Sequence, residues 1–333
     1  MATPLANKIA IRYSWRWAIA TFLSISVLAG CASLDSKQGQ WIFNPTDRIW
    51  GDTSQVAGGM QDVWIEYDSQ LTGKSVKLHA VVSPAARPAL AHPVAEGPKS
   101  YVQRVSAHTP DAHTDIQSQA PVLLYLHGAR WNVTGSAYRI QRMQELGFTV
   151  VAVDYRGFGK TSTETPSEKM AYEDALATKQ WIAKTYPERP RYIFGHSLGG
   201  AIAIELASKV DDEKGTIVEG TFTSIPDVAA TMAWGWLPLR PFISQRFESI
   251  KKVAQIGSPL LVVHGSNDTL IKPALGRQLF EAAAEPKKFI LVDGGSHHNT
   301  NAVGQAAYRV ALAEMFSIPR MLPAIEPTTL SIK

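Results

Sequence analysis

The sequence predicts an α/β fold in which a mostly parallel central sheet carries helices on both faces and a short helical cap. Two observations support this prediction. The first is that the apolar runs after position 121 are short and continuous, and the second is that they alternate with longer stretches of helical periodicity. Continuous apolar runs are typical of strands covered on both faces, and their alternation with helices favours one doubly wound domain.

The first predicted elements are two strands of a hairpin in 62–83, where apolar residues alternate and the turn lies near Leu71-Thr72-Gly73. The stretch 84–120 is rich in Ala, Pro, His and Ser, so we expect a surface insertion there. Apolar runs then predict strands at 122–126, 149–153, 192–194, 217–218, 260–263 and 289–292. Helical periodicity predicts helices at 137–146, 168–186, 198–210, 274–285 and 302–316.

A mixed segment, 225–256, interrupts this alternation and carries Trp234, Trp236 and several prolines. We expect it to form the cap over the carboxyl edge of the sheet, with tryptophans that either line an acyl pocket or belong to the core. The predicted organisation is a signal peptide (1–30), an N-terminal linker (31–58), one domain (59–320) and a C-terminal tail (321–333).

The charge distribution excludes a nucleic-acid partner. The formal net charge is +4, but Lys8, Arg12 and Arg16 lie within the first sixteen residues. The rest of the chain is therefore close to neutral, and it has no basic stripe that could track a phosphate backbone.

The N-terminus has the features of an export signal. The three cations precede an apolar run over 17–28, which ends in Leu28-Ala29-Gly30-Cys31. This ending resembles the bacterial lipobox, whose cysteine becomes the lipidated first residue of the mature protein. Cys31 is the only cysteine, so no disulfide competes for its thiol.

These features predict a lipid-anchored protein of the bacterial cell envelope. A transmembrane anchor and a plain cleaved signal are the alternatives, although the apolar run is shorter than the roughly 20 residues of a spanning helix. Ala32, rather than Asp, follows the cysteine. This residue favours the outer membrane, facing the periplasm.

The most specific motif is Gly195-His196-Ser197-Leu198-Gly199, a G-x-S-x-G sequence between an apolar run and a helical stretch. A nucleophile elbow requires this context, because its turn leaves no room for a Cβ two residues before or after the serine. Ser197 is therefore the predicted nucleophile.

A serine hydroxyl needs a base to accept its proton and an acid to orient that base. Asp268 follows the apolar run 260–263 in a polar turn and is the predicted acid, with Glu219 as the alternative. Two adjacent histidines, His297 and His298, follow the last predicted strand. Spacing from the preceding glycine pair favours His297 as the base, and Asp293 is interpreted as a turn residue.

The predicted oxyanion hole consists of two backbone N–H groups, from Leu198 after the nucleophile and from Ala129 after the early strand. We interpret His127 as a structural residue of that loop. No phosphate-binding glycine motif is complete, and no histidine or cysteine spacing fits a catalytic metal.

Together these motifs resemble the α/β-hydrolase superfamily, and more narrowly its BEM46-like and ABHD13/ABHD17-like branch. The matching stretches, spread over about 60–316, are 126–128, 154–160, 166–168, 195–200, 219–227, 259–268 and 294–299. Two positions depart from that branch: Ala129 replaces its usual Asn, and His298 replaces the Asn of its usual His-Asn-Asp. The second departure leaves His298 as a rival base.

The resemblance implies hydrolysis of acyl esters or thioesters on small-molecule or lipid substrates, without a cofactor. A serine aminopeptidase-like amide hydrolase would use the same residues with a different pocket. A non-catalytic scaffold lipoprotein is the alternative from another class.

Overall fold

The computed structural model describes residues 34–46, 53–86, 119–233 and 235–318. The predicted signal peptide, Cys31, the tail 321–333 and most of the 84–120 insertion lie outside these residues. Among the helices that are described, none combines the length and apolar character needed to cross a bilayer.

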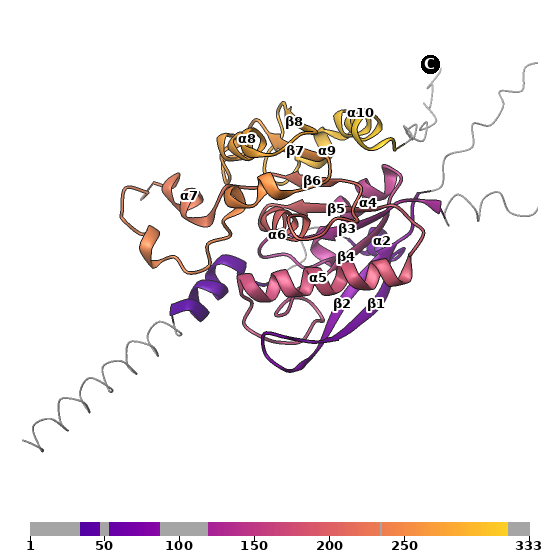
Figure 1. Cartoon of the computed structure of the whole chain (residues 1–333), viewed down its shortest axis with the longest axis horizontal. Helices are drawn as coiled ribbons and strands as arrows, with labels where there is room; N and C mark the ends of the chain where they lie inside the picture. Colours follow the sequence, from indigo (N-terminus) through magenta and orange to yellow (C-terminus); the bar gives the residue numbers. More distant parts are fainter. Residues whose placement is uncertain (1–33, 47–52, 87–118, 234, 319–333) are drawn as a thin grey trace, which may run out of the picture.

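Eight strands form one sheet in the order β1-β2-β4-β3-β5-β6-β7-β8 (Figure 1). The strands are β1 (Gln61–Asp68), β2 (Ser75–Ser83), β3 (Val122–Leu126), β4 (Thr149–Val153), β5 (Arg191–His196), β6 (Thr216–Glu219), β7 (Leu260–Gly265) and β8 (Lys287–Val292). The hairpin β1–β2 is antiparallel, as is the pairing of β2 with β4, and all pairs from β4 to β8 are parallel. The predicted mostly parallel sheet is confirmed.

The helices cover both faces of this sheet. On one face α5 (Glu168–Thr185), α6 (Leu198–Ala207) and α8 (Pro273–Ala282) contribute to one apolar core. On the other face α4 (Ala137–Glu145) and α10 (Gln305–Phe316) contribute to a second core. The residues of β3 and β4 are all buried, and they alternate between the two cores, which explains their continuous apolar sequences.

The segment 34–43 is helical and belongs to the folded domain, which corrects the linker predicted over 31–58. Phe43 at its end is fully buried, and its ring contacts those of Phe158 and Phe247 at 6.1 and 5.7 Å between centroids. Because 34–43 is otherwise rich in polar residues, its position depends on these tertiary contacts rather than on its own periodicity.

The cap predicted over 225–256 contains one short helix, α7 (Ile225–Ala230), and three single-turn 3-10 helices, η2 (Arg240–Phe242), η3 (Ser249–Lys251) and η4 (Val253–Gln255). Ser224 caps α7, since its hydroxyl accepts a hydrogen bond from the Asp227 N–H. The cap extends beyond one end of the sheet and lies beside helix 34–43 (Figure 1).

Candidate active site

Ser197 lies in the sharp turn between β5 and α6. Its backbone has φ 55° and ψ −119°, a left-handed conformation that is unfavourable for a residue with a side chain. A Cβ on Gly195 would lie 2.2 Å from the Gly199 carbonyl oxygen, and one on Gly199 would lie 2.1 Å from the Leu126 carbonyl oxygen. Only glycine fits these two positions. This turn therefore requires both glycines of the G-x-S-x-G motif.

The structure brings Ser197, His297 and Asp268 together from three separate loops. His297 Nε2 lies 3.0 Å from Ser197 Oγ, and His297 Nδ1 lies 2.8 Å from Asp268 Oδ2. All three side chains are buried. The nucleophile, base and acid predicted from the sequence therefore form one continuous hydrogen-bonded chain.

Asp268 is placed to remain a carboxylate. Burial alone would raise its pKa, but hydrogen bonds from His264 and His297 hold the pKa well below its usual range. Its second oxygen, Oδ1, accepts hydrogen bonds from the N–H groups of Leu270 and Ile271 at 3.0 and 2.8 Å. These donors also fix the direction in which the carboxylate points.

The rival histidine, His298, points elsewhere. Its ring contacts that of Trp131 at 5.3 Å between centroids, and it lies edge-on to His297 at 5.4 Å. Its carbonyl accepts a hydrogen bond from Arg139 Nη2 at 3.1 Å. The geometry therefore favours His297 over His298 as the base.

Glu219, the alternative acid, has other partners than His297. Its carboxylate accepts hydrogen bonds from Arg139 Nε at 3.0 Å and from the Tyr308 hydroxyl at 2.6 Å. Asp293 is exposed, and its carboxylate contacts the Ser266 hydroxyl. Neither carboxylate has a hydrogen bond to His297 in the described structure.

The predicted oxyanion donors lie beside the serine. Leu198 is the first residue of α6, whose N-terminus carries partial positive charge, and Ala129 follows Gly128, on which a Cβ would lie 3.1 Å from the Ser197 Cβ. Within the part of the chain that the structure describes, no carbonyl accepts from the N–H of Leu198 or Ala129. His127 is fully buried with Nδ1 2.7 Å from the Gly128 carbonyl, which agrees with a structural role in this loop.

A pocket of about 790 Å³ opens over Ser197. Its lining includes the apolar residues Ile42, Phe222, Ile225, Val228, Leu270 and Ile271. It also includes the polar or basic residues Asn44, Arg130, Ser136 and His298. No Asp or Glu is among the described residues that line it, so the pocket suits an apolar chain joined to a neutral or anionic group.

Two features of the site were not predicted. Trp41 and Ile42 of the N-terminal helix line the pocket, although nothing in their local sequence indicates it. His196 Nε2 lies 3.0 Å from the His297 carbonyl, and burial lowers the pKa of His196 well below its usual range, so a neutral ring donates this bond. The sequence around His196 gives no signal for this contact, because the acceptor is the carbonyl of a loop 101 residues further along the chain.

The sheet order, the elbow and the Ser-His-Asp geometry define the class: this chain has the α/β-hydrolase fold. A family model described as serine aminopeptidase, S33, matches residues 117–252. Among solved structures, the Pyrococcus furiosus esterase Pf2001 is similar with a TM-score of 0.59 and 18% identity, over 84% of this chain and 98% of that one. This likeness shows the fold.

The chain is 37% identical over 192 residues to the zebrafish (Danio rerio) lysophosphatidylserine lipase ABHD12, covering 52% of this chain and 50% of that protein. It is 33% identical over 181 residues to an uncharacterised Mycobacterium tuberculosis protein, covering 54% and 63%. The chain thus spans between half and two thirds of the length of these relatives. The comparisons support a hydrolase, and the narrower branch named from the sequence stays a prediction.

Proposed function

We propose that this protein is a serine hydrolase that cleaves carboxylic esters or thioesters of acyl chains. The observation that carries the proposal is the hydrogen-bonded chain from Ser197 through His297 to Asp268, of which Ser197 and His297 line a pocket with many apolar residues. A nucleophile, a base and an orienting acid in this order constitute the machinery of acyl transfer.

In the proposed mechanism, Ser197 Oγ attacks the acyl carbonyl carbon while His297 Nε2 accepts the hydroxyl proton. Asp268 accepts the Nδ1–H bond, which orients the ring and stabilises its positive charge. The N–H groups of Leu198 and Ala129 stabilise the oxyanion. His297 then protonates the departing alcohol or thiol. Water attacks the acyl carbon with His297 again as the base, the bond from the acyl carbon to Ser197 Oγ breaks, the carboxylic acid leaves and His297 returns the proton to Ser197 Oγ.

For the substrate, we propose an amphiphilic acyl ester such as a lysophospholipid. The apolar residues of the lining accommodate an acyl chain, and Arg130 and His298, which also line the pocket, suit a neutral or anionic head group. The name of the zebrafish relative, a lysophosphatidylserine lipase, points to the same substrate class.

An aminopeptidase activity is the second candidate, suggested by the matching family model. An aminopeptidase binds the ammonium group of its substrate, which a nearby carboxylate stabilises. The described lining contains Arg130 and no Asp or Glu, so this observation favours ester over amide substrates.

The test uses the full-length protein and a fluorophosphonate probe, which labels activated serines. We expect an adduct on Ser197 that is lost in Ser197→Ala and His297→Ala but retained in His298→Ala. Lysophospholipids should be hydrolysed, and aminoacyl anilides much more slowly. Absence of labelling in folded protein would support the non-catalytic scaffold instead, and faster amide cleavage would support the aminopeptidase.

We further propose that lipidation of Cys31 attaches the protein to the cell envelope, at the outer membrane facing the periplasm. The support is the sequence Leu28-Ala29-Gly30-Cys31 after an apolar run. Wild-type protein should incorporate labelled palmitate and fractionate with outer membranes, whereas Cys31→Ser should not incorporate the label. Equal labelling of both proteins would contradict lipidation at Cys31.

A further inference from the structure

The most exposed large apolar side chains of the described residues gather in two elements. Trp236, Trp41 and Phe242 are 80%, 69% and 66% exposed, and they belong to the cap and to helix 34–43. Leu34, Met232 and Leu237 of the same elements are also exposed. We call these six residues the apolar face. Large exposed apolar surface of this kind is uncommon on a soluble monomer and indicates an interaction site.

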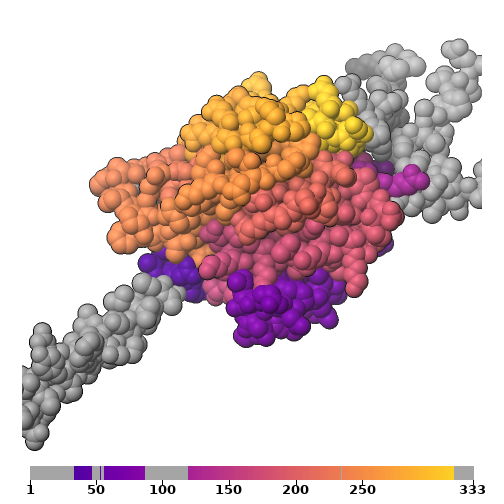
Figure 2. Space-filling view, in the orientation of Figure 1, coloured from indigo at the N-terminus to yellow at the C-terminus, as the bar shows by residue number. Residues whose placement is uncertain are grey.

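The two elements that carry this face are joined to each other. Gln38 Nε2 donates to the Phe242 carbonyl at 2.6 Å, and Gln38 Oε1 accepts from the Ser244 N–H at 2.8 Å. Asp35 accepts hydrogen bonds from the side chains of Ser244 and Gln245. Helix 34–43 (indigo) and the cap (orange) accordingly adjoin at one end of the molecule in the space-filling view (Figure 2).

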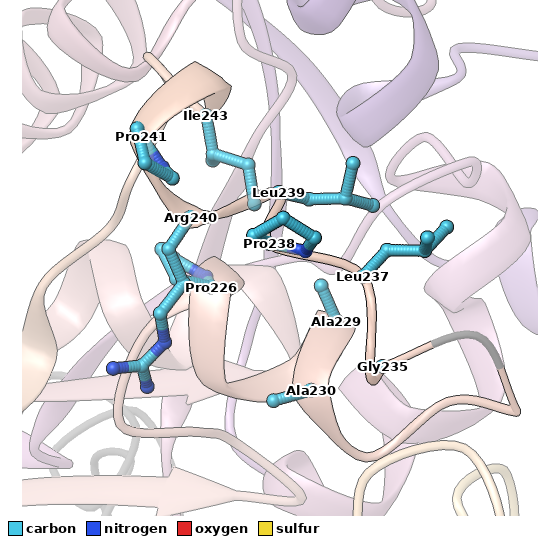
Figure 3. Close-up of a pocket in the computed structure, with 10 residues that line it drawn as sticks. All are labelled: Pro226, Ala229, Ala230, Gly235, Leu237, Pro238, Leu239, Arg240, Pro241 and Ile243. Atoms are coloured by element: carbon cyan, nitrogen blue, oxygen red, sulfur yellow. The ribbon is translucent and has the colours of Figure 1, made fainter.

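The apolar face adjoins the mouth of the catalytic pocket. Trp41 belongs to both, and Ile225 and Val228 of the cap line the same pocket. A second hollow of about 200 Å³ lies within the cap itself, among Pro226, Ala229, Leu237, Pro238, Pro241 and Ile243 (Figure 3). Leu237 of the apolar face lines this hollow, so the cap carries apolar surface of its own outside the catalytic pocket.

The sequence on the N-terminal side indicates what covers this face. Helix 34–43 begins three residues after Cys31 and six after the apolar run 17–28, so either a lipid on Cys31 or the apolar run itself would bring a bilayer close to Leu34. Tryptophan is enriched at the membrane–water interface, where its ring is partly buried and its N–H remains hydrated. Lys37, in the same helix, and Lys272, beside the pocket residue Ile271, are exposed and suit anionic lipid.

We infer that the apolar face docks on the lipid bilayer and turns the catalytic pocket toward it, so that an amphiphilic ester enters directly from the membrane. This inference rests on the proposed function for its substrate and on the location of the chain at a membrane. It adds a second, non-covalent contact that orients the domain, whereas an anchor at Cys31 would only tether it.

The experiment compares three forms of the full-length protein reconstituted in vesicles of phosphatidylethanolamine and phosphatidylglycerol. They are the wild type, the double variant Trp236→Ser/Phe242→Ser, and the control Leu71→Ser/Leu291→Ser. The control residues are about half exposed and lie in the β1–β2 turn and on β8, away from the cap. None of the four residues lines the catalytic pocket.

Each form is assayed on lysophosphatidylserine in the vesicles and on a soluble short-chain ester, and its tryptophan fluorescence is measured with brominated lipids as quenchers. We expect the cap variant to lose about tenfold in kcat/KM on the vesicle substrate, or ~1.4 kcal/mol. Its soluble-ester activity should stay within about twofold, and the fractional quenching of the tryptophans that it retains, Trp41 of the apolar face included, should fall. The control should match the wild type.

Unchanged vesicle activity and quenching in the cap variant would overturn docking while leaving the proposed function intact. Absence of soluble-ester hydrolysis in the wild type would instead contradict the proposed function, and the quenching would still decide the docking. The wild type could also prove dimeric in detergent while the cap variant is monomeric. This result would show that the apolar face binds a second copy of the chain, and it would overturn the inference that the face docks on the bilayer.

Discussion

Ser197 combines a reactive side chain with a strained backbone. Its positive φ is maintained by the bonds from the Ser197 N–H to the Glu219 carbonyl and from the Thr221 hydroxyl to the Ser197 carbonyl, at 2.9 and 2.8 Å. Such a conformation costs a residue with a side chain about 1–3 kcal/mol, and glycine adopts it freely. The elbow thus positions the Ser197 Oγ, and the backbone conformation that this requires lowers the free energy of unfolding.

Replacing Ser197 with glycine should therefore raise the free energy of unfolding by about 1–3 kcal/mol while abolishing hydrolysis. Ser197→Ala is the matched control, because it removes the hydroxyl but keeps the Cβ, and it should lack most of this gain. Urea unfolding followed by circular dichroism measures both. A glycine variant no more stable than the alanine variant would show that the turn is not strained.

Asp268 orients His297 through a charged hydrogen bond. Asp268→Asn should lower kcat by about 10³–10⁴-fold with a smaller change in KM, because the amide stabilises neither the required tautomer nor the imidazolium. Asp293→Asn, in an exposed turn of the neighbouring loop, should retain activity within about twofold. Similar losses in both variants would contradict the assignment of Asp268.

At the residue scale, the sequence predicted the side chains that the structure brings into one hydrogen-bonded chain. Glycine spacing identified Ser197, and positions after strands identified Asp268 and His297. The supporting contacts of His264 and His196 could not be predicted, since each joins a side chain to a loop whose path depends on the whole fold.

At the scale of elements, the buried strands were predictable because burial on both faces leaves a continuous apolar run in the sequence. All six predicted strands of the parallel part are present. The last predicted helix, 302–316, is divided at Gly304 into α9 (Thr300–Val303) and α10. Helix 34–43 was missed because Lys, Gln and Gly give it little apolar periodicity, and long-range contacts of Phe43 and Gln38 position it.

The place of Phe43 in the core leads to a stability prediction. Phe43→Ala should lower the free energy of unfolding by about 3–5 kcal/mol, since it removes a fully buried ring that packs against Phe158 and Phe247. Leu34→Ala in the same helix removes an exposed side chain and should change stability by less than about 0.5 kcal/mol. Equal effects in a urea titration would indicate that the helix does not pack as described.

At the scale of the whole molecule, stability should depend on pH through His79 in β2. Its ring nitrogens lie 3.0 Å from carboxylate oxygens of Asp154 and Asp62. Burial lowers the pKa of His79, but these two hydrogen bonds outweigh it and raise the pKa above its usual 6.5. The stabilisation by protonated His79 is thus complete below about pH 6.5 and is lost as the pH rises through the higher folded-state pKa.

His79→Gln should remove this component, so the stability difference between wild type and variant should shrink as the pH rises from about 6 to 8. The informative quantity is the difference in free energy of unfolding between wild type and variant. Burial lowers the pKa values of His127 and His196, which makes stability rise with pH, but this contribution is the same in wild type and variant and cancels in the difference. Chemical denaturation at several pH values measures it. A difference that grows with pH would show that His79 is neutral in the folded protein.

The bond between Gln38 and Phe242 joins positions 204 residues apart and has a consequence for the order of synthesis. The segment carrying Trp41 leaves the ribosome first, yet it cannot take its place in the pocket until the cap has emerged. The base at His297 emerges later still. A chain that ends between Ser197 and His297 has the nucleophile but neither its base nor a finished binding pocket, so the proposed hydrolysis begins only after His297 has emerged.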